Sequence, residues 1–315
     1  MNRLIITLTP FPSIEYIYHV EEFEPRKVLT SNHVSLNILS KGIYSAQIMK
    51  VLQEEPILIS SLGGFTGKSV KHYLDKSKVK SDINWTEHET PHQVKILLQN
   101  TINDYTITTK QSIMLEREFI KLNHKLNTHI KKVSTLVLSG NIPQEQDAKI
   151  FSQWIKLGKS HNVKTIVSTG QKEVWSYLIV EKPYAILLTE KQLETLGFET
   201  INIEEMATRL KEYLGGGLHY IGIYLKNRGA LVLSKNKYCH VQSSCQLMNQ
   251  GNTATSGAFL GAMAVSINRK YEQEKMAKLC LAAALSADDN VVHHICNKKD
   301  IDYRYKKTKV RQLEL

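Results

Sequence analysis

Histidine and cysteine side chains, the usual ligands of transition metals, come together at one place in the chain. His293 and His294 are followed closely by Cys296, and no second pair of candidate ligands lies nearby. A structural zinc site needs four ligands, and paired spacings such as C-x-x-C usually supply them. The four cysteines, Cys239, Cys245, Cys280 and Cys296, show no such spacing. We therefore expect no metal site, and we expect reduced thiols.

Glycine clusters offer a second kind of chemistry, because a glycine-rich loop that opens a helix can cradle phosphate. The cluster Gly215-Gly216-Gly217 follows a predicted helix over 204–214 and precedes a predicted strand over 220–225. Glycines in that position are typical of a helix C-terminus and the turn after it. This cluster therefore predicts a turn rather than a phosphate loop.

Short apolar strands and helices alternate through the middle of the chain. Predicted helices over 115–131, 146–160, 190–196 and 204–214 alternate with strands over 135–138, 165–167, 185–188 and 220–225. This order is typical of βαβ units and predicts a mainly parallel sheet covered by helices. A hairpin over 230–233 and 239–241 and a helical, Ala-rich stretch over 279–287 follow.

The N-terminal part adds strands of another kind. Buried strands are expected over 4–8 and 57–59, with a helix over 46–53 between them. Residues 14–39 and 93–109 alternate apolar and polar side chains, which indicates half-buried strands with one solvated face. The second of these segments reads as a hairpin that turns at Asn103-Asp104. Together they predict an extra strand layer on one α/β domain.

Composition excludes several protein classes. The 315 residues are 42% apolar and 23% charged, close to globular averages, so a disordered, collagen-like or disulfide-scaffold protein is excluded. No run approaches the ~18 apolar residues of a spanning helix, and we expect a soluble, cytoplasmic protein with no membrane partner. The net charge is +11, but the lysines are spread along the chain apart from a basic tail over 298–315. A solvated surface explains that distribution, and no nucleic-acid partner is expected.

Six motifs in order resemble the PfkB branch of the ribokinase-like sugar kinases, specifically 1-phosphofructokinase and tagatose-6-phosphate kinase. They are Thr7-Leu8-Thr9-Pro10, Ser40-Lys41-Gly42-Ile43, Gly63-Gly64-Phe65-Thr66-Gly67, Ser139-Gly140-Asn141-Ile142-Pro143, Leu225-Lys226-Asn227-Arg228-Gly229-Ala230 and the glycine-bearing segment 251–263. Each motif alone is weak. Their order, on a matching layout of strands and helices, is specific for the fold.

The resemblance implies a single domain over residues 1–315, built as a three-layer α/β/α sandwich with a small β-sheet lid. The lid strands would come from about 12–40 and 84–110. Such kinases use ATP and Mg²⁺ to phosphorylate a hydroxyl of a sugar or sugar phosphate. In that family a G-A-G-D segment opens a helix whose amides form an anion hole, and its aspartate takes the proton from the attacking hydroxyl. Family members often form homodimers through the lid.

The catalytic aspartate of that pattern has no counterpart in this chain. Depending on the register, its position falls on Ala254, Ser256, Gly257 or Ala258, and no acidic residue lies between Cys245 and Arg269. An unperturbed serine hydroxyl does not accept a proton at neutral pH. We therefore expect no catalytic residue at this position.

Other functional positions of the family pattern have changed as well. The N-x-x-E motif that helps to position the metal reads Thr189-Glu190-Lys191-Gln192, and the early substrate aspartate is Ser13. Leu39 and Ser40 replace two glycines of the sugar motif, Tyr44 replaces its asparagine, and the phosphate-gripping T-R of the lid is Thr90-Pro91. Loss of a general base alone usually lowers turnover about 10²–10⁴-fold. These changes favour a chain that kept the fold and lost most or all turnover.

The resemblance still assigns some residues to binding. The substrate candidates are Lys41, Gly42 and Ser139, and the nucleotide candidates are Leu225, Lys226, Gly229, Ser256 and Gly257. Lys41 contacts a substrate phosphate or is simply solvated. Lys226 and Arg228 either supply charge at the nucleotide phosphates or form a basic turn at the end of a strand. ATP and Mg²⁺ are the implied cofactors, although the changed motifs argue against both.

Two functions remain open from the sequence. The first is a pseudokinase that binds a phosphosugar, a nucleotide or a protein partner. The second is an active phosphotransferase that acts on an alcohol group of a phosphosugar through a relocated carboxylate such as Glu190. A homodimer through the lid is compatible with either.

Overall fold

The computed structural model describes residues 4–24, 26–98, 104–110, 113–143, 147–198, 202–245, 252–288 and 295–314. Ten strands of this part of the chain form one large sheet in the order β14-β13-β12-β11-β10-β9-β8-β1-β4-β5. They are β1 (Leu4–Thr9), β4 (Ile57–Gly63), β5 (Lys80–Thr86), β8 (Val133–Ser139), β9 (Lys164–Ser168), β10 (Ala185–Thr189), β11 (Tyr220–Tyr224), β12 (Ala230–Ser234), β13 (Lys237–Ser243) and β14 (Thr308–Gln312). The strands from β11 to β5 are parallel, and β12, β13 and β14 extend the sheet in antiparallel fashion.

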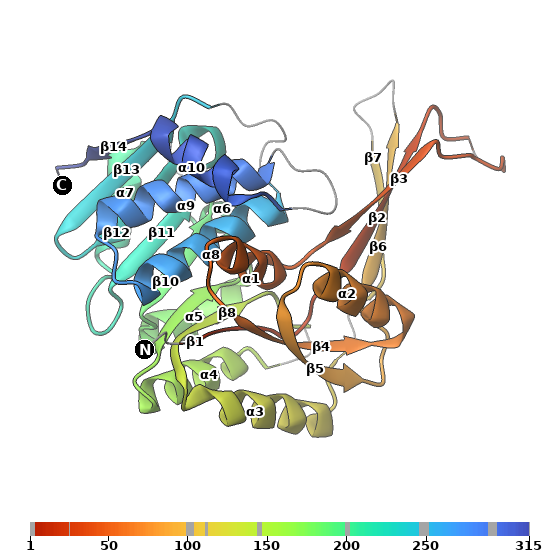
Figure 1. Cartoon of the computed structure of the whole chain (residues 1–315), viewed down its shortest axis with the longest axis horizontal. Helices are drawn as coiled ribbons and strands as arrows, with labels where there is room; N and C mark the ends of the chain where they lie inside the picture. The colour runs from red at the N-terminus through yellow and green to blue at the C-terminus, as the bar shows by residue number, and fades with distance from the viewer. Residues whose placement is uncertain are drawn as a thin grey trace.

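Helices cover both faces of the large sheet, as expected for a parallel sheet whose strands are buried on both sides (Figure 1). One apolar core contains buried residues of α1 (Lys41–Val51), α2 (Gly64–Lys76), α8 (Thr253–Asn268), α9 (Gln273–Asp288) and α10 (Lys298–Lys307). The other core contains those of α3 (Glu116–Ile130), α4 (Lys149–Ser160), α5 (Lys172–Glu181), α6 (Glu190–Thr195) and α7 (Ile203–Lys211). A short 3₁₀ helix, η1 (Lys226–Arg228), follows β11. The predicted three-layer α/β/α architecture is confirmed.

A separate small sheet projects from this body (Figure 1). Its four strands run in the order β3-β2-β6-β7, with β2 (Ile14–Val20), β3 (His33–Ile38), β6 (His92–Leu98) and β7 (Asp104–Thr108). β2 and β6 are parallel neighbours, whereas both outer pairs are antiparallel. The segments 12–40 and 84–110 supply these strands, except that Asn84, Trp85 and Thr86 belong to β5 of the large sheet.

Several elements differ from the sequence prediction. The first helix begins at Lys41 rather than at residue 46, because Ser40 caps it by accepting a hydrogen bond from the Ile43 amide. The sequence analysis missed α2, α5, β5 and β14. The basic segment 298–314 is part of the fold rather than a separate tail, because it forms α10 and β14, and β14 pairs with β13. The turn predicted at Asn103-Asp104 falls partly outside the described residues, and Asp104 is the first residue of β7.

Close packing between α1 and α8 depends on glycine. A Cβ atom added to Gly261 would lie 2.5 Å from the Ser45 backbone oxygen, and one added to Gly257 would lie 2.6 Å from the Tyr44 Cβ. Both distances are shorter than a non-bonded contact allows. On the other side of α1, a Cβ added to Gly42 would lie 2.7 Å from the Thr9 Cβ of β1. Glycine therefore lets α1 approach both α8 and the sheet.

This packing predicts a stability defect in Gly261→Ala. The added methyl group forces α8 away from α1, and overpacking of this kind typically costs about 1–3 kcal/mol. Urea denaturation followed by circular dichroism measures the loss. Gly170→Ala is the matched control, because Gly170 is exposed and its added Cβ would meet only the Asn141 side chain at 3.2 Å. Equal stability of Gly261→Ala and wild type would contradict the packing argument.

Candidate active site

A cavity of about 540 Å³, here called the main cavity, lies between the carboxyl ends of central strands and the small sheet. Ligands of open α/β sheets usually bind beyond the carboxyl ends of the strands, and this volume is typical of a small-molecule site. The described lining residues are Thr9, Phe11, Ser13, Leu39, Ser40, Lys41, Pro91, His92, Gln93, Thr108, Thr109, Gly140, Asn141, Ser168, Thr169, Gly170, Lys191 and Thr253. None of them is an aspartate or a glutamate.

Two helices begin at the main cavity. Ser40 and Lys41 at the start of α1 line it, as does Thr253 at the start of α8. Asn252 caps α8 by accepting a hydrogen bond from the Thr255 amide at 3.0 Å. Helix N-termini carry partial positive charge and free amides, which favour a bound anion. The N-termini of α1 and α8 therefore give this part of the main cavity a positive electrostatic potential.

Lys41 adds a cation to the same place. Its Nζ donates to the Ser168 Oγ at 3.4 Å, and the described residues offer it no carboxylate. Burial of the ammonium group lowers the pKa of Lys41 to about 8. An anionic ligand would offset this desolvation by pairing with the charged form. Lys41 therefore lines the main cavity, and its contact with a substrate stays a prediction.

The other two substrate candidates occupy structural positions. Ser139 is fully buried at the end of β8, its hydroxyl has no hydrogen-bond partner among the described residues, and it does not line the main cavity. A Cβ added to Gly42 would lie 2.5 Å from the Ser139 Oγ. Gly42 and Ser139 thus pack helix against strand. The next residues along the chain, Gly140 and Asn141, line the cavity instead.

The position of the family aspartate lies within the first turns of α8. Ser256 is 3% exposed, and its hydroxyl lies 3.2 Å from the Thr253 backbone oxygen, to which it donates. Gly257 packs on the backbone of Lys41, and Ala258 is fully buried. Ala254 is half-buried against the core. A hydroxyl that donates to its own helix cannot take a proton from a ligand.

The predicted nucleotide contacts form a tight turn after β11. The Leu225 amide donates to the Gly229 oxygen at 2.9 Å, and Leu225 is buried in the core. Gly229 has a φ of +86°, and a Cβ there would lie 2.0 Å from the Val241 oxygen, so glycine is required for the turn. The nucleotide candidates Leu225, Lys226 and Gly229 do not line the main cavity. Nor do Ser256 and Gly257.

Glu190, the candidate relocated carboxylate, is held by two cations of that turn. Its Oε1 accepts from the Arg228 guanidinium at 2.7 Å, and its Oε2 lies 3.9 Å from the Lys226 Nζ. The next residue, Lys191, lines the main cavity. The ion pairs neutralise much of the charge that Lys226 and Arg228 would offer a nucleotide. They also withdraw Glu190 from the role of a free base.

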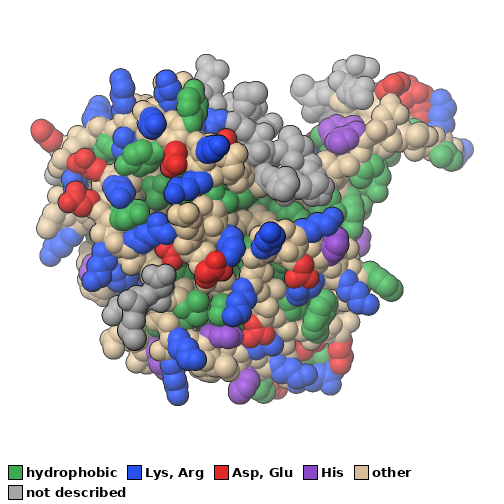
Figure 2. Space-filling model, in the orientation of Figure 1, with side chains coloured by type: hydrophobic (Ala, Val, Ile, Leu, Met, Phe, Trp, Pro, Cys, Tyr) green, Lys and Arg blue, Asp and Glu red, His purple; other side chains and the backbone are tan. Residues whose placement is uncertain are grey.

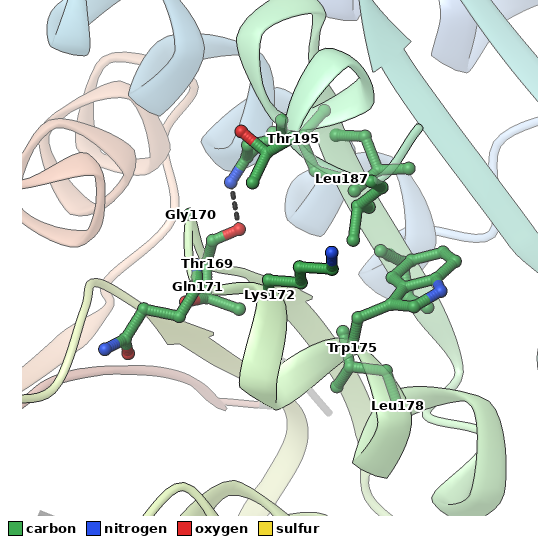
Figure 3. Close-up of a pocket in the computed structure, with 12 residues that line it drawn as sticks. Thr169, Gly170, Gln171, Lys172, Trp175, Leu178, Leu187 and Thr195 are labelled. Atoms are coloured by element: carbon green, nitrogen blue, oxygen red, sulfur yellow. Dashed lines mark hydrogen bonds between the residues drawn. The ribbon is translucent and has the colours of Figure 1, made fainter. Parts of the chain in front are cut away.

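A second hollow lies behind the loop that follows β9, and Figure 3 shows its lining. Lys172 and Trp175 of α5 face Leu187 of β10 across it. Its free space is about 10 Å³, room for a single water. The Gln192 amide nitrogen donates to the Thr169 oxygen there, and the Gln192 oxygen accepts from the Thr189 amide. Gln192 therefore ties α6 to the rim of the main cavity.

The sequence analysis missed residues of the small sheet that face the main cavity. His92, Gln93 and Thr108 line it, and the buried Nδ1 of His92 has no partner among the described residues. Glu15 lies beside Gln93, and its Oε1 accepts from the Gln93 Nε2 at 2.5 Å. The only sequence feature that could have identified these residues is the alternation of polar and apolar side chains along the strands. That alternation is equally compatible with a polar face in contact with solvent and with one that lines a cavity.

Comparison with known proteins identifies the family. Residues 12–288 match the family described as pfkB family carbohydrate kinase. The chain belongs to the pfkB family of carbohydrate kinases. It is 22% identical to a tagatose-6-phosphate kinase of Staphylococcus epidermidis over 98% of this chain and 99% of that protein. It is 26% identical to a 1-phosphofructokinase of Borreliella burgdorferi over 73% of this chain and 74% of that one.

A solved structure has the same fold. A mutant of phosphofructokinase-2 from Escherichia coli superposes with a TM-score of 0.85, at 19% identity, over 96% of this chain and 98% of that chain. The ribokinase-like fold predicted from the six motifs is thus confirmed. The comparison concerns the fold, and the positions of the site residues come from the structure of this chain.

The residues at the metal-positioning motif differ from the N-x-x-E pattern. At the N-x-x-E position, both polar atoms of Gln192 are already engaged and Glu190 pairs with Arg228. Mg²⁺ is usually held by one or two carboxylates and the phosphates it accompanies. The residues at this position do not fit that requirement. Among the described residues no group of three or more His, Cys, Asp or Glu side chains could hold a metal ion, and His293 and His294 lie outside them.

Figure 2 shows lysine and arginine side chains spread over the visible face with acidic side chains between them. No helix among the described residues is long and apolar enough to cross a membrane. The four cysteines are unpaired, two of them buried.

The lowered pKa of Lys41 predicts how anion binding depends on pH. The ammonium is fully charged well below pH 8 and is lost as the pH rises through about 8, so affinity for inorganic phosphate falls between pH 7 and 9. Inorganic phosphate itself gains negative charge in the lower part of this range, so affinities are expressed per phosphate dianion, and the remaining pH dependence comes from the protein. Isothermal titration calorimetry across the range measures the effect.

Two variants isolate Lys41 as its source. Lys41→Met is expected to bind phosphate at least about tenfold more weakly at pH 7 and to show no pH dependence above it. Lys41→Arg keeps its charge to high pH, so its affinity should stay constant from pH 7 to 9. An unchanged pH profile in Lys41→Met would contradict the assignment.

Proposed function

We propose that this pfkB-family chain binds a phosphosugar in the main cavity and has lost most or all kinase turnover. The proposal is carried by one observation: no described residue that lines the main cavity is a carboxylic acid. A sugar hydroxyl must give up its proton as it attacks the terminal phosphate of ATP, and kinases use an aspartate to accept it. The cavity offers cations and helix N-termini, which bind a phosphate group but do not remove a proton.

The residues at the two ends of the main cavity support binding of a sugar phosphate. Lys41 and the start of α8 lie at one end, where negative charge is favoured. The small sheet contributes Gln93, Thr108 and Thr109, which can form hydrogen bonds with hydroxyl groups. The named relatives, a tagatose-6-phosphate kinase and a 1-phosphofructokinase, are consistent with a phosphosugar ligand. A nucleotide or a protein partner remains a less supported ligand.

An active kinase with a relocated base is the second candidate, and His92 is the observation that favours it. Its imidazole lines the main cavity, and its buried Nδ1 has no partner among the described residues. An imidazole nitrogen without a hydrogen-bond partner can act as a general base. Glu190, in contrast, is engaged by Arg228. Turnover that disappears in His92→Gln would select this candidate over the pseudokinase.

Restoring an acid at the start of α8 tests the proposed loss directly. We expect Ser256→Asp to raise sugar-dependent ADP formation at least about tenfold over wild type, because the carboxylate would stand where the anion hole opens. Ser256→Asn has similar size and no base, and it is expected to leave the wild-type rate unchanged. Equal rates for Ser256→Asp and Ser256→Asn would contradict the role given to this position.

A homodimer through the small sheet is also proposed. One face of this sheet carries the exposed apolar side chains of Tyr18, Val34, Tyr105 and Ile107, and Ile107 is 67% exposed. Contiguous apolar surface of this kind marks an interaction site.

Light scattering is expected to give the mass of a dimer for the wild type and of a monomer for Ile107→Lys. Lys95→Ala changes a side chain that points to the opposite face of the same sheet and is expected to leave the dimer intact. A monomeric wild type would rule out the interface.

A further inference from the structure

Four polar side chains form a row across the inner face of the small sheet. Strand register places Glu15 of β2 opposite Asn37 of β3 and opposite Gln93 of β6, and it places Gln93 opposite Thr108 of β7. Gln93 and Thr108 line the main cavity. The row therefore extends from the cavity wall to the buried carboxylate behind it.

Glu15 is the centre of this row. It is only 9% exposed, and the described residues include no cation paired with it. Its Oε1 accepts from the Gln93 Nε2 at 2.5 Å, and its Oε2 accepts from the Asn37 Nδ2 at 3.2 Å. Each carboxylate oxygen thus has an amide donor, which satisfies a charge that would otherwise be costly to bury.

An ionised carboxylate can only accept hydrogen bonds, so it determines which way a neighbouring amide turns. The Nε2 of Gln93 must face Glu15, and its Oε1 must face away from it. The described residues offer that oxygen no donor. Because Gln93 lines the main cavity, its free carbonyl oxygen is available to a ligand that donates a hydrogen bond.

We propose that Glu15 is a specificity-determining residue that holds Gln93 with its carbonyl oxygen toward the main cavity, so that the small sheet selects a ligand bearing hydroxyl groups. This inference rests on the proposed function and assigns the hydroxyl end of its ligand. The opposite end, at Lys41, takes the anionic group. The two ends together select a hydroxylated phosphate ester over a bare anion.

Glu15→Gln tests the orientation with little change in size. A glutamine accepts at one end and donates at the other, so it cannot receive both amides and no longer determines which way Gln93 turns. We expect the affinity for fructose 6-phosphate or tagatose 6-phosphate to fall about tenfold, which corresponds to about 1.4 kcal/mol. The affinity for inorganic phosphate should stay within about twofold. Isothermal titration calorimetry measures both.

A second change provides the rescue. In Glu15→Gln combined with Asn37→Asp, the new carboxylate at position 37 accepts from the nitrogen of residue 15. The oxygen of residue 15 is then free to accept from Gln93 again. We expect sugar-phosphate affinity to return to within about threefold of wild type. Glu21→Gln, an exposed change just beyond β2, is the matched control and should have no effect.

The outcomes separate the inference from the proposed function. Loss of sugar-phosphate affinity in Glu15→Gln, with rescue by the double variant and unchanged phosphate affinity, supports the inference. Wild-type affinity in Glu15→Gln, or equal loss for sugar phosphates and inorganic phosphate without rescue, overturns it while the proposed function stands. A wild-type protein that binds inorganic phosphate but neither sugar phosphate overturns both.

Discussion

The contact of α1 with α8 on one side and with β1 and β8 on the other is the constraint on which the site depends. Glycines at 42, 257 and 261 allow backbone to approach at distances that any Cβ would prevent. Because α1 is held between α8 and the sheet, both helices start at the same edge, where the parallel strands end. The electropositive end of the main cavity follows from this packing and needs only Lys41 to complete it.

Residues that support the scaffold differ in their contacts from residues at the positions that the motifs assign to phosphoryl transfer. Positions that support the scaffold, such as Gly42, Gly229 and Ser139, have structural roles that do not depend on a ligand. At positions that the sequence motifs assign to phosphoryl transfer, polar side chains make local contacts. Ser256 donates to its own helix, Gln192 bridges two loops, and Glu190 pairs with Arg228. Under the proposed function, each contact engages a polar group that would otherwise be available to a ligand.

Much of the fold could be predicted from the sequence, because alternation of short apolar strands with helices has few solutions other than a parallel three-layer domain. The helices over 116–130 and 203–211 and the hairpin of β12 and β13 were found within a few residues. Strand β5 was missed because its half-buried pattern lacks a continuous apolar run. The predicted first helix began too far along the chain because Gly42 is a residue type typical of turns. The site was harder to predict. Lys41 was assigned through its motif, whereas His92 and Gln93 line the cavity, and Glu15 contacts Gln93, only through the pairing of distant strands.

Transfer of the terminal phosphate of ATP to a sugar shows directly whether the chain has lost kinase turnover. Purified protein at a concentration comparable to that of radiolabelled ATP, with Mg²⁺, would be incubated with fructose 1-phosphate, fructose 6-phosphate, tagatose 6-phosphate or ribose. Kinases turn over at about 1–100 s⁻¹, so even a loss of several orders of magnitude leaves a visible signal. We expect the chain to bind a phosphosugar and to transfer label at a rate at least about 10²-fold below that range. Transfer within the range for any of these sugars would contradict it.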